Sequence, residues 1–277
     1  MHVRSHTIGP VTSYAEVRPT QRTPFARYRH SLWLLTKRDL RVRYSTNALG
    51  YFWSILDPLL MAAIYYFVFV FIFHRGSVGE QPYIVFLLSA LLPWMWFNGT
   101  ISDCTRAYMR EAKLIRSTTI PRTIWVNRIV LSKGIEFVAA LPVLAIFAIV
   151  FGARVNIDAI YFPLAIVLQA ILSVGVGMIV APLVVFFRDL ERAVKLILRM
   201  LFYASPIIYG IEAVPESVRH LTIFNPLTGI LSLYRAAFFP GELDWKAVIV
   251  AAISSVILLA IGMWVFARTQ RAVLKEI

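Results

Sequence analysis

Long apolar runs, separated by polar segments, cover most of this chain. Several of them reach or exceed the roughly 20 residues that an α-helix needs to cross about 30 Å of hydrocarbon. The runs do not alternate in polarity from residue to residue, as the strands of a membrane β-barrel would. We therefore predict an all-α integral membrane protein with six transmembrane helices, at about residues 51–73, 82–101, 126–151, 160–187, 196–211 and 245–266.

The segment Arg27–Tyr44, RYRHSLWLLTKRDLRVRY, has a different pattern. Its apolar residues share one helical face, which Asp39 and Arg43 interrupt. Aromatic and arginine side chains suit a helix that lies in the membrane interface, so we predict an N-terminal interfacial amphipathic helix. An ordinary solvated helix is the alternative. Residues 1–26 are predicted to be a flexible N-terminal tail, and residues 27–277 a single transmembrane domain.

A moderately apolar segment, Glu212–Asp244, precedes the last span. Its apolar pieces, LTIF and LTGILSLY, are too short to cross a membrane, and Pro215, Pro226 and Pro240 divide the segment. Short apolar pieces broken by proline favour re-entrant or interfacial helices. The alternative is an external loop that packs on the spans.

Composition and charge agree with a membrane protein and give it an orientation. The chain is 59% hydrophobic, against about 45–50% in soluble domains. The net charge is +13, but the positive residues lie mainly between the spans, so nucleic-acid binding is not expected. The N-terminal region, the loop 102–125, the segment 188–199 and the C-terminal tail hold 21 Lys and Arg, whereas the other connections hold four. The positive-inside rule then places both termini in the cytoplasm.

Motifs for chemistry are missing. The sequence contains no G-x-x-x-x-G-K-[ST], G-x-S-x-G or H-E-x-x-H pattern, so we expect neither ATP hydrolysis nor another enzymatic activity in this chain. Cys104 is the single cysteine, and the five histidines are scattered without metal-ligand spacing. No metal site and no cofactor of its own are expected.

Three ionisable residues fall inside the predicted spans: Asp57, Lys133 and Glu136. Each should face protein or water, because a charge at a helix centre is costly. Lys133 and Glu136 are three residues apart and share a helix face, which favours a structural pair over a transport role. Asp57 precedes Pro58 and either caps a local kink or contacts substrate.

Aromatic residues are dense, with 19 Phe, 12 Tyr and 7 Trp. Trp94, Trp96 and Phe97 lie near a predicted span end, where an interfacial belt is the ordinary interpretation. Tyr and Trp rings also combine apolar faces with polar tips, which suits sugar rings passing through a pore.

Several motifs resemble those of one transporter class. RYSTNALGYFWSILDPLL, with Leu49, Gly50 and Trp53, looks like the opening of permease subunits of polysaccharide-exporting ABC transporters of the type-2 class. The same family is matched, in order and approximate spacing, by four dipeptides: Pro121-Arg122, Arg188-Asp189, Ser205-Pro206 and Asn225-Pro226. The resemblance extends from about Arg27 to the C-terminus.

The resemblance implies a homodimer of permeases, docked on two copies of a separate ABC ATPase subunit that binds ATP and Mg²⁺. It also implies a bacterial inner (plasma) membrane location, contact with membrane lipids, and a cargo of glycan linked to a polyprenyl diphosphate, such as O-antigen, teichoic acid, capsule or galactan. The composition, with 22 Arg against 6 Lys, suggests a GC-rich genome and hence a cell-wall galactan exporter of mycobacterial type.

Candidate site residues follow from this interpretation. A short charged helix at about Arg110–Thr119 is predicted to contact the ATPase; a loop that only sets topology is the alternative. Arg41 and Arg43 are candidates for the lipid diphosphate, because guanidinium groups pair bidentately with phosphate. The ATPase-coupling candidates are Arg110, Glu111, Lys113, Arg116 and Arg122, and the glycan-path aromatic candidates are Trp53, Tyr65, Tyr66, Trp94 and Tyr203.

Three other functions remain open from sequence: a type-2 ABC exporter of drugs, haem or other lipids, a membrane enzyme acting on a polyprenyl substrate, and a scaffold for a cell-wall complex. The absence of acidic catalytic pairs disfavours the enzyme. Small residues in the fourth span also allow another helix to approach closely; they are Ser173, Gly175, Gly177 and Ala181.

Overall fold

The computed structural model describes residues 23–45, 52–72, 79–118 and 120–276, and these residues form helices joined by short connections, without a β-strand. Four segments are long and apolar enough to cross a membrane. They confirm the predicted second, third, fourth and sixth spans as long apolar helices. Their bounds are α3 Tyr83–Cys104, α6 Ile124–Val150, η2 Ile157–Tyr161 with α7 Phe162–Phe186, and α11 Trp245–Glu276.

The two remaining predicted spans are shorter helices. α2 (Phe52–Tyr66) continues as the π-helical η1 (Phe67–Ile72), and its apolar part, Leu56–Ile72, falls below spanning length. α8 runs from Leu190 to Ala204, so the prediction of a span at 196–211 was wrong at both ends. Pro206 ends the helix, because proline disfavours helical geometry in the preceding residue, and Ser205 is extended (φ −98°, ψ 145°).

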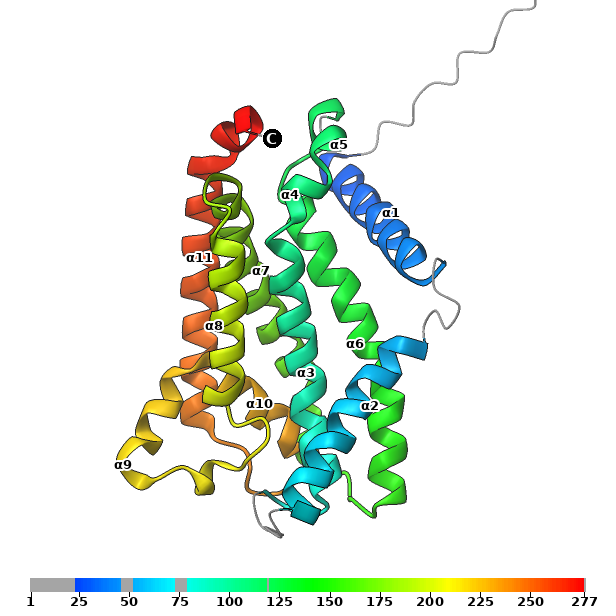
Figure 1. The fold of residues 1–277 in the computed structure, drawn as a ribbon, viewed down its shortest axis with the longest axis vertical. Coiled ribbons are helices and arrows are strands. Elements are labelled where there is room, and N and C mark those ends of the chain that lie inside the picture. The colour runs from blue at the N-terminus through cyan, green and yellow to red at the C-terminus, as the bar shows by residue number, and fades with distance from the viewer. Residues whose placement is uncertain (1–22, 46–51, 73–78, 119, 277) are drawn as a thin grey trace, which may run out of the picture.

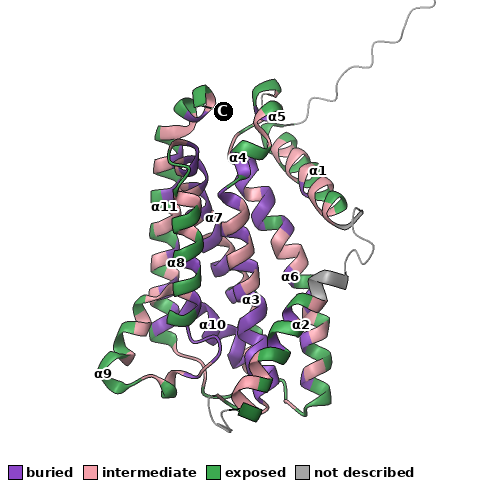
Figure 2. Ribbon diagram, viewed as in Figure 1, coloured by how far each residue is buried: buried purple, intermediate pink, exposed green. Residues whose placement is uncertain are grey.

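α3 is the central helix of the bundle (Figure 2). In its most apolar stretch, 83% of the residues are buried inside the chain. Hydrogen bonds tie it to two neighbours: Trp96 donates Nε1 to the carbonyl of Val130 on α6, and Gln169 of α7 donates to the carbonyl of Pro93. Because α3 is covered by protein on most sides, the side chains that line any path must come from its few open positions.

Glycines allow α7 and α11 to pack backbone to backbone. A Cβ on Gly175 would lie 2.6 Å from the amide nitrogen of Leu259, and one on Gly262 would meet the carbonyl of Gly175. Gly177 faces Cys104 and Val126 instead. At Gly175 and Gly177, the small residues noted in the fourth span therefore pack against other helices of the same chain.

The ends of the bundle differ (Figure 1). At one end, α1 (Pro24–Ser45), α4 (Ala107–Arg110) and α5 (Ala112–Ser117) gather near the C-terminal end of α11. α1 confirms the predicted helix Arg27–Tyr44 and extends it slightly. The single helix predicted at Arg110–Thr119 is instead α4 and α5, because the backbone at Glu111 leaves helical geometry (φ −111°, ψ 15°).

The opposite end holds the segment 205–244, and helix α10 is its most buried part. Gly229 brings α10 against α11, since a Cβ there would overlap the carbonyl of Ala247. Short helices are therefore present where the sequence predicted them, and their depth in a membrane stays a prediction. Their bounds are η3 Ile211–Ala213, α9 Glu216–Arg219, η4 His220–Phe224 and α10 Pro226–Ala236.

Candidate functional site

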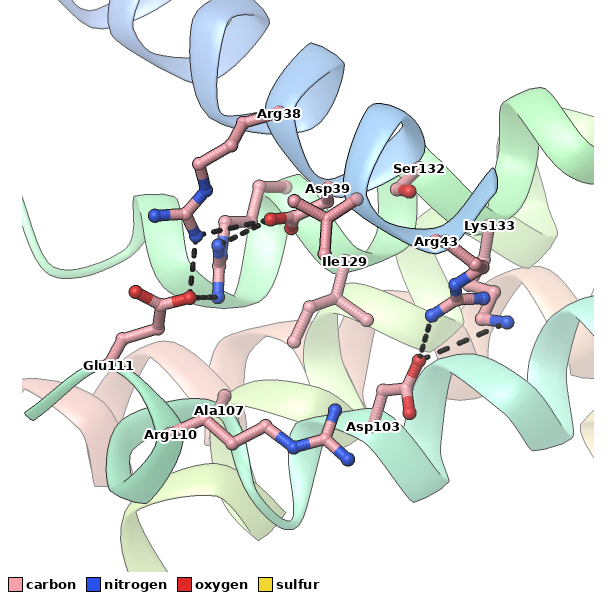
Figure 3. Close-up of a pocket in the computed structure, with 12 residues that line it drawn as sticks. Arg38, Asp39, Arg43, Asp103, Ala107, Arg110, Glu111, Ile129, Ser132 and Lys133 are labelled. Carbon is pink, nitrogen blue, oxygen red and sulfur yellow. Dashed lines mark hydrogen bonds and ion pairs between the residues drawn. The ribbon is translucent and has the colours of Figure 1, made fainter. Parts of the chain in front are cut away.

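A three-helix junction of charged side chains stands where α1 crosses α6 (Figure 3). Arg128 of α6, whose side chain is only 5% exposed, donates Nη1 to Asp39 of α1 at 2.9 Å and Nη2 to Glu111, between α4 and α5, at 3.2 Å. Arg38 of α1 donates to the same oxygen of Glu111 at 2.5 Å. Although burial disfavours its charge, the hydrogen bonds to Glu111 and Asp39 raise the pKa of Arg38. Ion pairs thus join all three elements.

A second charged cluster lies further along α1. Arg43 donates Nη2 to Asp103 at 2.8 Å and Nη1 to Glu136 at 2.9 Å. Lys133 donates to Glu136 at 3.1 Å, so the predicted pairing of these two residues is confirmed. The pair is also shared with α1 and α3, because Arg43 and Asp103 join it.

A cavity of about 570 Å³ separates the two clusters. Arg110 of α4 extends into it (Figure 3). Among the described residues, no hydrogen bond or ion pair holds its guanidinium group. The cavity is therefore a polar, water-accessible space lined mostly by groups already paired with one another.

A groove of about 560 Å³ runs between α2, α3 and α8. One half of it is aromatic: Tyr65 of α2, Trp94 of α3, and Phe202 and Tyr203 of α8. The Phe202 ring centroid lies 5.8 Å from that of Tyr65, 5.4 Å from that of Trp94 and 5.1 Å from that of Tyr203. These contacts make Phe202 the centre of an aromatic wall.

The other half of the groove is polar and cationic. Asn98 and Ser102 of α3 face Lys195 and Arg199 of α8 across it. Lys195 donates to Glu191 at 2.7 Å. Arg106 also donates to Glu191, so two cations share the carboxylate of Glu191.

Arg235 of α10 fixes the segment that follows α8 at the opposite end of the bundle. Its buried guanidinium donates to the carbonyl of Ile207 at 2.9 Å and lies 3.6 Å from the ring centroid of Phe86. Glu242 lies 3.9 Å away. Tyr83 donates its hydroxyl to the carbonyl of Ile208 at 2.8 Å. The carbonyls of Ile207 and Ile208, in the non-helical segment after α8, thus accept hydrogen bonds from α10 and α3.

The predicted ATPase-coupling residues divide into two groups. Arg110 and Glu111 point toward the charged cavity, where Glu111 pairs with Arg38 and Arg128. Lys113 and Arg116 are exposed on α5, and Arg122 is half-buried. The role of all five at an ATPase contact stays a prediction.

The remaining candidates are also placed. Tyr65, Trp94 and Tyr203 come together in the groove, whereas Tyr66 stacks on Tyr83 and does not line it. The side chain of Trp53 lies outside the described residues. Arg41 is exposed and lines neither cavity, while Arg43 is engaged by two carboxylates. Asp57 is exposed and Pro58 is buried.

Sequence reasoning missed several residues of these sites. Asp39 and Arg128 were passed over because their contacts join segments far apart in the chain. Lys195 and Arg199 were also missed, although they precede the selected Tyr203 at four-residue intervals, which is one face of a helix, so this signal was present in the sequence. Among the residues described, no group of three or more His, Cys, Asp or Glu is placed to hold a metal ion.

Comparisons with known proteins show the family of this chain. A family model described as an ABC-2 type transporter matches residues 30–239. The O-antigen export system permease protein RfbA of Klebsiella pneumoniae is 34% identical over 236 residues, which is 85% of this chain and 90% of that protein. A protein of the same name from Myxococcus xanthus is 28% identical over 84% of this chain and 89% of its own length. The polysialic acid transport protein KpsM of Escherichia coli is 24% identical over 86% of this chain and 92% of its own length.

Proposed function

Because this chain belongs to the ABC-2 type transporter family, we propose that it is the transmembrane subunit of an ATP-driven exporter that moves a polysaccharide out of the bacterial cytoplasm. The names of its relatives, which refer to O-antigen export and polysialic acid transport, support this cargo class. The structural observation that carries the proposal is the groove between α2, α3 and α8, in which aromatic rings line one wall.

The groove has the chemistry of a sugar path. Ring faces cover the apolar faces of a sugar, and the hydroxyls of Tyr65 and Tyr203 remain available to its polar edges. Tyr203 is 59% exposed, so its ring is accessible from the open side. We further propose that the protein is a homodimer in which two such grooves face a common pathway, since one open groove cannot enclose a polymer by itself.

An ATPase subunit that binds ATP and Mg²⁺ would dock at the end formed by α1, α4 and α5. The exposed cations Lys113 and Arg116, with Arg122 beside them, are the proposed contacts. Glu111 would transmit their displacement inward, because its ion pairs join the break between α4 and α5 to α1 and α6. A displacement of α5 would therefore be passed to both α1 and α6.

The proposed orientation places this end in the cytoplasm of a cell whose inner membrane holds the protein. The excess of Lys and Arg in the N-terminal region and the loop 102–125 supports it. α1 and the C-terminal end of α11 lie at the same end of the bundle, as an even number of crossings requires (Figure 1). α10 and the short helices before it would then lie at the outer side.

The cargo is proposed to be a glycan linked to a polyprenyl diphosphate, of the O-antigen, teichoic acid or galactan type. Among these, the Arg-rich composition favours a galactan of an actinobacterial cell wall.

Depletion of the protein, followed by analysis of lipid-linked glycans on each side of the inner membrane, tests the proposal. We expect polyprenyl-diphosphate polymer to accumulate on the cytoplasmic side, which also identifies the sugar. Unchanged glycan pools, with altered tolerance to a small toxic compound, would replace the proposal with export of drugs or other lipids.

A further inference from the structure

We propose that Lys195 and Arg199 of α8 form an anion site at the cationic end of the groove between α2, α3 and α8, and that this site holds the phosphate-bearing end of the cargo. The inference rests on the proposed function, because it takes the cargo to be a glycan on a lipid diphosphate. It assigns the phosphate to α8, whereas the sequence had suggested Arg41 and Arg43 of α1.

The two cations are placed as a pair. They are four residues apart on α8, so their side chains leave the same helix face one turn apart. Both line the groove, and Asn98 and Ser102 line the facing wall of α3, where an amide and a hydroxyl add neutral donors. A phosphate group between the two walls would meet donors from both helices.

The groove is cationic at one end and aromatic at the other. Going along α8, Lys195 and Arg199 come first and Phe202 and Tyr203 follow. α3 runs in the opposite direction, so Ser102 and Asn98 lie beside the cations and Trp94 beside the rings (Figure 1). A cargo with a phosphate at one end and sugar next to it matches both halves in order.

The cations at this end exceed the carboxylates. Lys195 has Glu191 as a partner, but within the described residues no carboxylate forms an ion pair with Arg199. An arginine on a membrane-embedded helix is costly unless it faces water, protein or an anion. Guanidinium binds two phosphate oxygens at once, and ammonium adds a compact point charge, so the two types together suit a diphosphate.

The candidates on α1 offer less. Arg43 already donates to Asp103 and Glu136 at 2.8 and 2.9 Å, and a phosphate would have to displace both carboxylates. Arg41 is exposed outside either cavity. Two copies of α8 facing one another would also bring like charges together, which favours a water-filled space at this end over a dry interface.

Equilibrium binding of farnesyl diphosphate to the full-length protein in phosphatidylcholine nanodiscs tests the site. We expect Arg199→Gln and Lys195→Gln each to weaken binding about tenfold or more, because each removes a charge-assisted contact, and Arg199→Lys to retain part of the affinity. Arg192→Gln is the matched control, since Arg192 is exposed on the same helix and does not line the groove. Loss of binding in Arg41→Gln, with Arg199→Gln as strong as the wild type, would overturn the assignment.

Competition separates the possible sources of the anion. Farnesol should compete poorly and farnesyl monophosphate partly. Inorganic diphosphate competing as strongly as farnesyl diphosphate would make this a site for free phosphate and overturn the lipid assignment. If phosphatidylglycerol in the nanodisc abolished binding of farnesyl diphosphate, the site would bind anionic lipids in general, and the assignment to the cargo would be overturned.

Depletion in cells keeps the two proposals apart. If glycan accumulates on depletion while Arg199→Gln binds the probe normally, the anion site is wrong and polysaccharide export stands. If glycan pools do not change while binding depends on Arg199, the anion site stands and the cargo is another phosphate-bearing lipid.

Discussion

Nη1 of Arg128 donates a hydrogen bond to Oδ1 of Asp39 across 2.9 Å, and this contact fastens the N-terminal helix α1 to α6. The other terminal nitrogen of Arg128 reaches Glu111, at the break between α4 and α5. One nearly buried side chain therefore holds together the elements that form this end of the bundle. Removing it would leave two carboxylates with reduced compensation, which is more costly than losing an exposed ion pair.

Arg128→Met should destabilise the protein by about 2 kcal/mol, because Asp39 and Glu111 each lose a charge-assisted hydrogen bond and keep Arg38 as a cationic partner. We expect a lower thermal transition in detergent and faster chymotryptic cleavage within α1. Lys37→Met is the control, since Lys37 is exposed on α1. Equal protease sensitivity of the two variants would show that Arg128 does not hold α1. The double variant Arg128→Met/Asp39→Asn should lose less than the two single losses added together.

The hydrophobic pattern predicted the long helices because spanning length and apolarity are properties of each segment alone. α8 shows where this reasoning fails. Its first half carries Glu191, Arg192, Lys195 and Arg199, so an apolarity criterion placed the predicted start several residues after the helix begins. Ser205-Pro206 ended the helix earlier than the apolar run suggested. At the break between α4 and α5, the side chain of Glu111 bonds to Arg38 and Arg128 of distant helices, and such contacts leave no local pattern in the sequence.

The candidate site was partly predictable. Lys133 and Glu136 could be paired from their spacing, because helical neighbours are fixed by sequence. The sequence identified Tyr65, Trp94 and Tyr203 because their side chains are aromatic. Their convergence depends on how α2, α3 and α8 pack, which the sequence does not show. The ion pairs that join Arg128 to Asp39, and Asp103 to Arg43, form only through tertiary structure, so no local pattern identifies them.

Charge reversal at Arg116 of α5 and at Arg122, which lies between α5 and α6, should weaken ATPase association and thereby lower export. Arg116→Glu and Arg122→Glu place a negative charge at the proposed ATPase contact, and we expect membrane insertion to be normal while ATPase association in a pull-down and export both fall. Glu111→Gln is the contrasting variant, because its partners lie within the chain; it should lower thermal stability and spare association. Wild-type association and export in both charge-reversal variants would remove α5 from the contact.

Gly229→Ala should separate α10 from α11. The added Cβ would overlap the carbonyl of Ala247, and backbone cannot move aside as a flexible side chain can, so we expect a loss of about 2–3 kcal/mol from overpacking. Gly99→Ala is a matched helix-interior control, because its nearest neighbour would be the flexible Lys133 side chain at 3.3 Å. The measurement is the thermal transition of each purified variant. Equal transitions would mean that α10 and α11 are not in close contact.

Arg235→Leu should loosen the segment that follows α8. The carbonyl of Ile207 would lose its donor at 2.9 Å and Glu242 its nearby cation, at a cost of about 2–3 kcal/mol. A cysteine introduced at Ile208, which is 7% exposed, reports the change through its rate of maleimide labelling. Cys104 is fully buried and should contribute little background. Labelling should be slow while Arg235 is present and fast in the Arg235→Leu variant, and an equal rate would contradict the role of this arginine.

Tyr203→Leu should lower glycan export several-fold without lowering stability. The Tyr203 ring is 59% exposed and contacts Phe202 at the aromatic end of the groove, so its removal costs little packing but takes away a stacking surface for sugar. Tyr203→Phe keeps the ring and should export nearly as well as the wild type.

Trp264→Leu controls for the loss of an exposed ring, because Trp264 of α11 is 61% exposed and does not line the groove. Export is measured as glycan outside the inner membrane per unit of protein. If Tyr203→Leu and Trp264→Leu reduce it equally, the rings act on membrane placement and not as a sugar path; if only Tyr203→Leu reduces it, and Tyr203→Phe does not, the aromatic wall acts on the cargo.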